Sequence, residues 1–447
     1  MLFHSTNSDT SSEAPASPGA LVSFKDAVLR CLPSDGGLYV PDRAIDVRQF
    51  FLYMDEQTSF PDLAATLTPS LLESDLDPLS AARVAQSAFD FEPELIRLDD
   101  DFSLLNLYNG PTGFFNDFGI AFLAAVIEEL LGGGRGEQAI ALAAVRSDAG
   151  ASMTHAFSGR KGIYAVLVYP SGPIRGLDPA AFVSNGGNIL PIQVQGNFDD
   201  CQQLIYSAIC DREFSSRYNI TSANTINPGR LLPQVFYYLH AFIQAKRQLS
   251  GDLAFSVPCG NFGNLIAGLY AWKFGLPVSS FVAAMNSNNT LGDFIRGGSF
   301  SHGPLVRTNS PALDVRIPSN LSRLASFYRD SPAVMRNMVY PASISDELTL
   351  QTIENVWKKY RRHIDPHTAV AFAAAEQTAA AQKWKGHTHT VILATMHYAK
   401  KADLAYRVTG EKIGIPERFK FIREKADPAV IISPNLDAFE GLIANFF

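Results

Sequence analysis

The sequence predicts an α/β protein with two parallel-sheet domains and a helical N-terminal segment. Short apolar runs without polar alternation recur along the chain, and segments of helical period separate them. Strands of this kind are buried on both faces, as in parallel sheets that helices cover. The length of 447 residues exceeds one ordinary core, so two or three domains of roughly 150 residues each are expected.

The expected elements follow the chain in order. Residues 1–18 are rich in Ser, Thr, Pro and Ala and are expected to form a disordered tail. Residues 19–95 are helix-rich without a series of strands, which predicts a separate N-terminal helical cap. A small α/β domain is expected over 96–240 and a large one over 241–447. The predicted strands span 139–145, 163–170, 188–194, 254–258, 279–285 and 390–396, and helices are predicted over 151–157 and from about 199 to 211.

Composition excludes several classes of function. The net charge of −7 argues against a dedicated nucleic-acid binder, and the basic run Lys358 to His363 is interpreted as a solvated helix end. No apolar run reaches the ~20 residues that span a bilayer, and the first residues do not resemble a signal peptide. The four cysteines are scattered without a CxxC pair. We therefore expect no metal site, no membrane partner and a reduced, cytoplasmic compartment.

One loop is the best candidate for binding phosphate. Ligands of open parallel sheets bind in loops that follow strands, and "PCGNFGN" at 258–264 follows a predicted strand and precedes an apolar helix. Gly260 and Gly263 allow close approach of the backbone, and the helix start would direct N–H groups at an anion. A plain tight turn is the alternative.

Other polar positions have weaker signals. Arg146 in "RSDAG" at 146–150 could hold an anion bidentately, and a salt bridge to a neighbouring acid is an equal alternative. His387 and His389 are close in sequence but lack a third metal ligand, so they are interpreted as exposed. Asp365 and His367 in "DPHTAVAF" are interpreted as a helix start with a structural role.

Eight segments occur in the order in which threonine synthases carry them. They are 23–42, 107–119, 186–204, 221–238, 257–269, 310–324, 365–372 and 393–400. The chain therefore resembles the threonine synthase family over nearly its whole length after about residue 20. The resemblance implies the fold-type II, tryptophan synthase β-like architecture, pyridoxal phosphate as cofactor, and the conversion of O-phosphohomoserine and water to threonine and phosphate.

The resemblance also implies site residues. The cofactor phosphate would lie in the loop of Gly260, Asn261, Phe262, Gly263 and Asn264, with Thr395 at the pyridine nitrogen. The segments that lie near the substrate in the family contain Arg146, Ser147, Asp148, Ser222, Asn224, Asn227 and Arg230.

Asn116 departs from the family at the decisive position. The family pattern is Phe-Lys-Asp-Phe-Gly, and this chain has Asn116 in place of the lysine. That lysine forms the Schiff base with the cofactor and shuttles protons. An amide nitrogen is not nucleophilic and accepts no proton near pH 7, so Asn116 can take neither role.

Further departures favour natural divergence of the site over a single knockout. Arg146 and Ala149 replace family residues of the loop Ser-Gly-Asp-Thr-Gly, and the following segment 171–182 has no lysine. Asn109 and Tyr398 also differ from the family His and Pro. Lys400, Lys401 and Lys161 are the lysines considered as replacements.

Three hypotheses follow. The chain is a threonine synthase homologue without the family reaction that binds phosphate, pyridoxal phosphate or a phosphorylated amino acid. Alternatively, it is an active enzyme that uses another lysine such as Lys400. In the third, it is a non-catalytic protein-interaction module with a closed cleft. The sequence identifies no protein partner.

Overall fold

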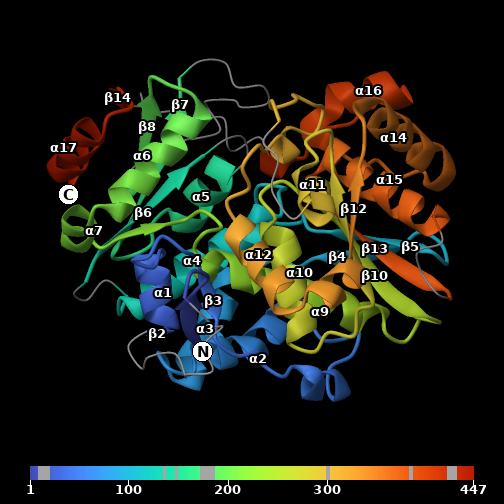
Figure 1. Cartoon of the computed structure of the whole chain (residues 1–447), viewed down its shortest axis with the longest axis horizontal. Helices are drawn as coiled ribbons and strands as arrows, with labels where there is room; N and C mark the ends of the chain where they lie inside the picture. The colour runs from blue at the N-terminus through green and yellow to red at the C-terminus, as the bar shows by residue number, and fades with distance from the viewer. Residues whose placement is uncertain are drawn as a thin grey trace.

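Two largely parallel β-sheets and one small antiparallel sheet organise the chain (Figure 1). The computed structural model describes residues 1–8, 21–133, 137–145, 149–171, 187–297, 303–381, 386–419 and 430–447. Among these residues, no helix combines the length and apolar character needed to cross a membrane. The α/β fold class is confirmed.

The larger sheet has six strands. Their order is β12 (Val339–Ser343), β11 (Ser280–Met285), β10 (Asp252–Pro258), β13 (Thr388–Ala394), β5 (Phe102–Asn106) and β4 (Glu94–Arg97). All neighbours are parallel except β4, which runs antiparallel to β5. The three predicted strands of this sheet are β10, β11 and β13.

The second sheet has five parallel strands. Their order is β14 (Val430–Ile432), β8 (Ile189–Val194), β7 (Ile163–Pro170), β6 (Ala139–Ala144) and β9 (Ile220–Ser222). The predicted strands at 139–145, 163–170 and 188–194 are confirmed as β6, β7 and β8. The two strands of this sheet that were not predicted, β9 and β14, have three residues each and lie at its edges, where the apolar signal is weak.

The N-terminal region differs from the expected disordered tail and from a helix-rich cap without a series of strands. Strands β1 (Leu2–Ser5), β2 (Val22–Ser23) and β3 (Tyr39–Pro41) form an antiparallel sheet. Met1 and Phe3 are 2% and 0% exposed. The tail prediction is therefore wrong for residues 1–8, because apolar side chains of this strand complete the core beneath it; residues 9–18 lie outside the described residues.

Sheet membership does not follow the expected linear division at residues 96 and 241. Strands β4 and β5, which precede most of the second sheet, pair with β13 in the larger sheet, and β14 returns to the second sheet near the C-terminus. The chain therefore crosses between the two sheets several times, which brings loops from distant segments together.

Helices cover both faces of the sheets. In chain order they are α1 (Phe24–Arg30), η1 (Arg48–Leu52), α2 (Phe60–Leu72), α3 (Pro78–Ala88), α4 (Asn116–Leu130), α5 (Ala149–Phe157), α6 (Phe198–Cys210), α7 (Arg212–Arg217), α8 (Pro228–Leu231), η3 (Leu232–Gln234), α9 (Val235–Ala245), α10 (Gly263–Lys273), α11 (Thr290–Gly297), η4 (Pro311–Leu313), α12 (Leu321–Asp330), α13 (Pro332–Met338), α14 (Asp346–Tyr360), α15 (Pro366–Ala380), η5 (Tyr398–Lys401), α16 (Ala402–Thr409), η6 (Glu417–Phe419) and α17 (Leu436–Phe446). The predicted helices at 151–157 and 199–211 are confirmed as α5 and α6.

The largest core cluster lies between the two sheets and includes α4, α9 and α10 (Figure 1). Successive residues of a strand face opposite sides, so Phe281 and Ala283 of β11 join this cluster while Val282 and Ala284 pack against α14 and α15. The outer face of the second sheet packs against α6 and α17. This layering fixes the loops at the carboxyl ends of the strands.

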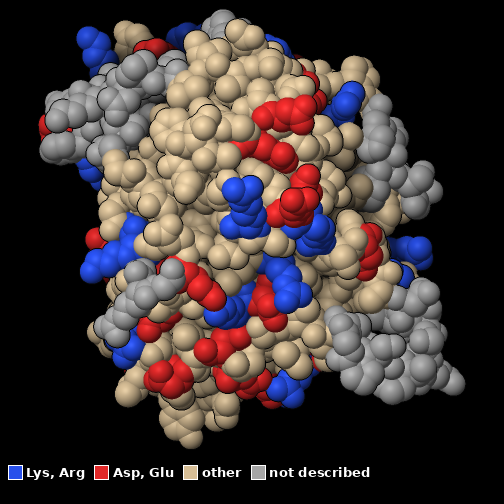
Figure 2. All heavy atoms as spheres, turned by 90° about the vertical axis from the view of Figure 1, so that its left-hand side faces the viewer, with Lys and Arg blue, Asp and Glu red and all other residues tan. Residues whose placement is uncertain are grey.

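The face at the left of Figure 1, which includes α17 and α7, is mixed in charge. Figure 2 shows Lys and Arg side chains scattered among Asp, Glu and neutral residues on this face. Interspersed charges of both signs are typical of an ordinary solvated surface.

Candidate functional site

The segment that carries Asn116 lies beside the loop that follows β13. Strands β5 and β13 are parallel neighbours, so the loops at their carboxyl ends meet. The N–H of Phe115 donates to the carbonyl of Thr395 at 2.9 Å, and the N–H of His397 donates to the carbonyl of Gly113 at 2.9 Å. These two bonds place the predicted residues Asn116 and Thr395 at one edge of the larger sheet.

The side chain of Asn116 is engaged by a buried arginine. Nη2 of Arg230 donates to Oδ1 of Asn116 at 3.0 Å, and Nη1 donates to the carbonyl of Ala223 at 2.6 Å. Arg230 is 5% exposed, and burial lowers its pKa to about 10, so it remains a cation at neutral pH. Its Nε has no partner among the described residues. Asn116 therefore serves as an acceptor for a buried positive charge.

Glycine makes this contact possible. Gly119 lies one helical turn beyond Asn116 in α4, and a Cβ there would stand 2.5 Å from the carbonyl oxygen of Arg230. Only a residue without a side chain lets α8 approach α4 so closely. The same glycine thus positions the guanidinium against residue 116.

Asp117 anchors the start of α4. Its carboxylate accepts hydrogen bonds from the N–H and hydroxyl of Thr112 at 2.9 and 2.7 Å, and the Thr112 hydroxyl lies 2.9 Å from that of Ser152. Burial raises the pKa of Asp117, and hydrogen bonds from Ser152 and Thr112 oppose this shift. The loop before α4 is therefore held in place by an internal network.

The loop at 259–264 has the geometry of an anion cradle. Phe262 has a left-handed backbone with φ of 60° immediately before α10. Within the described chain, no acceptor is bonded to the backbone N–H groups of residues 260–264. A Cβ on Gly260 would stand 2.6 Å from the carbonyl oxygen of Ala312. Free N–H groups at a helix start attract anions.

The two asparagine side chains of this loop contact the protein. Oδ1 of Asn261 accepts from the N–H of Ser319 at 3.2 Å. Oδ1 of Asn264 lies 2.7 Å from each of the Tyr237 and Tyr238 hydroxyls, while its buried Nδ2 has no partner among the described residues. The side chains brace the loop, which leaves its backbone for a ligand.

The substrate segment of the resemblance is partly occupied with structural bonds. Nδ2 of Asn227 donates to the carbonyl of Val28 at 2.9 Å and to that of Ser222 at 2.8 Å, and its Oδ1 caps α8. The amide of Asn224 bonds both backbone groups of Ala144. Ser222 is buried at the end of β9. Arg146, Ser147 and Asp148 lie outside the described residues.

A fully buried arginine that the sequence did not indicate holds this segment. Arg323 on α12 is 0% exposed, and it donates to the carbonyls of Thr225 and Ile226 at 2.8 and 2.7 Å and to that of Tyr39 at 3.0 Å. Its partners are up to 284 positions away in the chain. Local pattern carries no signal for such contacts.

The candidate replacement lysines lie at different ends of the sheets. Lys400 is half-buried in η5, with Nζ 5.5 Å from the centroid of the Phe419 ring, and Lys401 adjoins it. Lys161 is exposed and precedes β7, at the amino end of a strand. Only the first two therefore lie on a loop that follows a strand at the candidate site.

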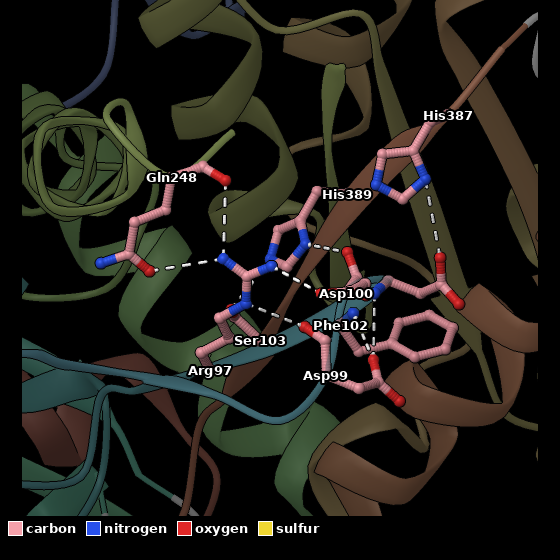
Figure 3. Close-up of polar contacts among 9 residues, drawn as sticks. Arg97, Asp99, Asp100, Phe102, Ser103, Gln248, His387 and His389 are labelled. Carbon is pink, nitrogen blue, oxygen red and sulfur yellow. Dashed lines mark hydrogen bonds and ion pairs between the residues drawn. The ribbon is translucent and has the colours of Figure 1, made fainter. Parts of the chain in front are cut away.

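His389 differs from the sequence prediction of an exposed histidine. It is buried in β13, with Nε2 2.8 Å from the Ser103 hydroxyl and Nδ1 2.8 Å from the Asp100 carbonyl (Figure 3). Burial lowers its pKa. His387 is exposed, 3.7 Å from Asp101. The prediction is wrong for His389 because β13 begins at Thr388. No group of three metal-ligating side chains occurs in the described residues.

Two other sequence interpretations are confirmed. Asp365 caps α15 and Pro366 is in its first turn. The Asp365 carboxylate also lies 2.6 Å from Nδ1 of His367, whose Nε2 accepts from the N–H of Ala312 at 3.2 Å. The basic run at 358–363 ends α14 with exposed lysines.

Comparison with known proteins decides the family. The family described as "Pyridoxal-phosphate dependent enzyme" matches residues 98–395, and "Threonine synthase N terminus" matches residues 10–89. Threonine synthase of Serratia marcescens is 33% identical over 89% of this chain and 90% of its own. This chain belongs to the threonine synthase family.

Other members of the family agree over nearly their whole length. Threonine synthase of Escherichia coli K12 is 33% identical over 93% of this chain and 94% of its own. The crystal structure of the Escherichia coli enzyme superposes with a TM-score of 0.87 at 28% identity, covering 100% of both chains. That of a pyridoxal-phosphate-bound threonine synthase from Brucella melitensis gives 0.86 at 27% identity, covering 100% of this chain and 99% of the other.

The residues present fit one part of the family cofactor and not the other. Free N–H groups around Phe262 and the start of α10 fit a phosphate. A covalent bond to the cofactor aldehyde needs an amine, and residue 116 presents an amide whose oxygen is hydrogen-bonded to Arg230. The site fits non-covalent binding of a phosphate-bearing molecule.

Proposed function

We propose that this member of the threonine synthase family binds pyridoxal phosphate or a related phosphate-bearing molecule without covalent attachment and does not carry out the family reaction. The hydrogen bond from Arg230 to Asn116 carries the proposal. Position 116 is built as an acceptor for a buried cation. The family reaction needs a nucleophilic amine at this position.

The charge of Arg230 favours a neutral acceptor such as Asn116 over a lysine at residue 116. A lysine ammonium at residue 116 would replace a favourable bond with a repulsion, because Arg230 is already a buried cation. Asn116 is neutral and offers its oxygen to Nη2. The substitution and the surrounding structure are therefore consistent with each other.

The proposed ligand contacts come from the loop 259–264. The backbone N–H groups of residues 260–264 would hold the phosphate, since none of these five is bonded to an acceptor within the described chain. Arg230 would contribute positive charge from α8, because its Nε has no partner there. When bound, the cofactor supplies an electron sink; this chain supplies binding groups but no amine at residue 116.

An active enzyme that uses Lys400 is the second candidate function. Burial raises the pKa of Asp117, the residue beside Asn116, and the positive charge of Lys400 is among the influences that oppose this rise. This ammonium therefore acts electrostatically on the site. Its Nζ also lies near the Phe419 ring. The two candidates differ in one observable, which is whether a lysine of the unmodified chain bonds to the cofactor.

One experiment separates the candidates. The protein is incubated with pyridoxal phosphate, and thermal unfolding is measured together with the visible spectrum, borohydride trapping and peptide mass spectrometry. We expect thermal stabilisation, because a ligand of the folded state raises stability, and no trapped adduct. Asn116→Lys should gain an adduct on residue 116, and Asn116→Gln should gain none.

The other outcomes are equally informative. A specific adduct on Lys400 in the unmodified protein would contradict the proposal and favour the active enzyme. No stabilisation by pyridoxal phosphate or inorganic phosphate would contradict ligand binding at the loop 259–264. That result would favour the protein-interaction module.

A further inference from the structure

A cleft outside the candidate site opens between Thr6 and Asn7, which follow strand β1, and helices α11, α12 and α13. Its volume is about 480 Å³, which lies within the range of small-molecule sites. Among the described residues that line it, none belongs to the loop 259–264 or contacts Asn116. Helix α12, which forms part of its wall, lies near the centre of Figure 1.

Two arginines make this cleft electropositive. Arg329 ends α12 and Arg336 lies on α13, and no described residue lining the cleft is acidic. Arg336 is exposed and has no hydrogen bond or ion pair within the described chain. Within the described part of the chain, the guanidinium of Arg329 makes only long polar contacts, 3.4 and 3.5 Å to the Thr6 carbonyl and 3.9 Å to Asp330. Both guanidiniums therefore keep donors for a ligand.

A buried hydroxyl adds a third donor. Tyr328 is 8% exposed, and its hydroxyl has no hydrogen-bond partner among the described residues. A buried polar group without a partner is unfavourable and calls for an explanation. Burial raises the pKa of Tyr328, so the group keeps its proton. The ring packs edge-on against Phe294 with centroids 5.3 Å apart.

The rest of the lining is mixed. Phe294, Ile295, Ala325 and Pro332 contribute apolar groups, and the small polar residues Thr6, Asn7, Ser322 and Ser326 lie beside them. Ligand sites commonly combine apolar surface with a few polar groups that fix the orientation of the ligand. The chain as a whole has a net charge of −7, so a local pair of cations is not a consequence of overall composition.

We propose that this cleft binds a small organic anion. Its carboxylate or phosphate lies between Arg329 and Arg336, where two guanidiniums form charge-assisted hydrogen bonds. It also accepts a hydrogen bond from the Tyr328 hydroxyl. The apolar part of the ligand packs against Phe294 and Pro332. The site is independent of the proposed function of the loop 259–264.

The test uses phenyl phosphate, phenylacetate and neutral benzyl alcohol as calorimetric probes of the full chain. We expect at least one anion to bind, the neutral probe not to bind, and Arg336→Gln to weaken the anion about tenfold. Arg407→Gln removes an exposed arginine on α16 as a matched control and should leave affinity unchanged. Comparing the affinities of the two anions then shows whether the cleft prefers a phosphate or a carboxylate.

A second variant separates binding from folding. Tyr328→Phe should weaken binding severalfold without lowering the thermal midpoint, because the hydroxyl has no hydrogen-bond partner to lose among the described residues. If phenyl phosphate also binds at the loop 259–264, calorimetry of the unmodified protein would show two binding sites. Arg336→Gln would then remove the site in the cleft and leave the other. Binding unaffected by Arg336→Gln, equal binding of benzyl alcohol, or no binding of either anion would overturn the proposal.

Discussion

Nη2 of Arg230 and Oδ1 of Asn116 lie 3.0 Å apart across a sequence separation of 114 residues. The contact joins α8 to the first residue of α4. It gives a buried guanidinium donor an oxygen acceptor on the side chain of residue 116. Our proposal that this family member lacks the family reaction rests on this pair.

Removing the acceptor at residue 116 should destabilise the fold. Asn116→Ala leaves Nη2 of Arg230 without its partner, and we expect a loss of about 1–3 kcal/mol in the free energy of unfolding. Asn116→Asp keeps an acceptor and adds an opposite charge, so it should retain stability near neutral pH. Urea unfolding of both variants measures the difference. Equal stability of Asn116→Ala and the unmodified protein would show that the contact contributes nothing.

Arg323 should be more sensitive to substitution than any exposed arginine. Its guanidinium bonds the carbonyls of Tyr39, Thr225 and Ile226 while fully buried. Lysine cannot reproduce this fork of donors, so Arg323→Lys should cost about 3 kcal/mol of unfolding free energy. Arg407→Lys, on exposed α16, should stay within about 0.5 kcal/mol. Chemical denaturation compares the two, and a similar small loss in both would refute the anchoring role.

Gly260 should be required for the shape of the phosphate loop. The Cβ of Gly260→Ala would stand 2.6 Å from the Ala312 carbonyl oxygen, so the loop must shift, at a cost of about 1–3 kcal/mol. We expect the thermal stabilisation by pyridoxal phosphate to be lost as well. Gly414→Ala is the control, because nothing lies within 4 Å of its Cβ position. Differential scanning fluorimetry with and without the cofactor measures both effects, and stabilisation retained in Gly260→Ala would place binding elsewhere.

Buried histidines should make the fold weaker in acid. Burial lowers the pKa of His240 to about 4, against about 6.5 in an unfolded chain. The unfolded state therefore binds more protons between these values. The stabilising contribution is complete above pH 6.5 and is lost as pH falls towards 4, with a slope of at most about 1.4 kcal/mol per pH unit.

The variant His240→Gln tests this assignment. It should flatten part of the profile of unfolding free energy between pH 6.5 and 4, measured by urea titration at each pH. Part of the slope should remain, because burial also lowers the pKa of His397 to about 4. An identical slope in the variant and the unmodified protein would assign the acid sensitivity to other groups.

The strand prediction succeeded where the signal is local. Runs such as 163–170 and 390–396 are apolar over their whole length because both faces of a parallel sheet are covered, and they became β7 and β13. The N-terminal strand β1 was missed because the Ser-, Thr-, Pro- and Ala-rich residues that follow it gave the whole segment 1–18 the composition of a tail. Only the packing of Met1 and Phe3 into the core reveals it.

The chemistry at residue 116 is determined by the sequence alone, because an amide is not a nucleophile in any fold. The sequence also predicted that the glycine-rich loop at 258–264 follows a strand, which is β10. Tertiary structure decided what Asn116 contacts, that His389 is buried, and that Tyr328 and two arginines line one cleft. These facts depend on contacts between segments far apart in the chain, and the 3.6- and 2-residue periodicities report only which face of an element is buried.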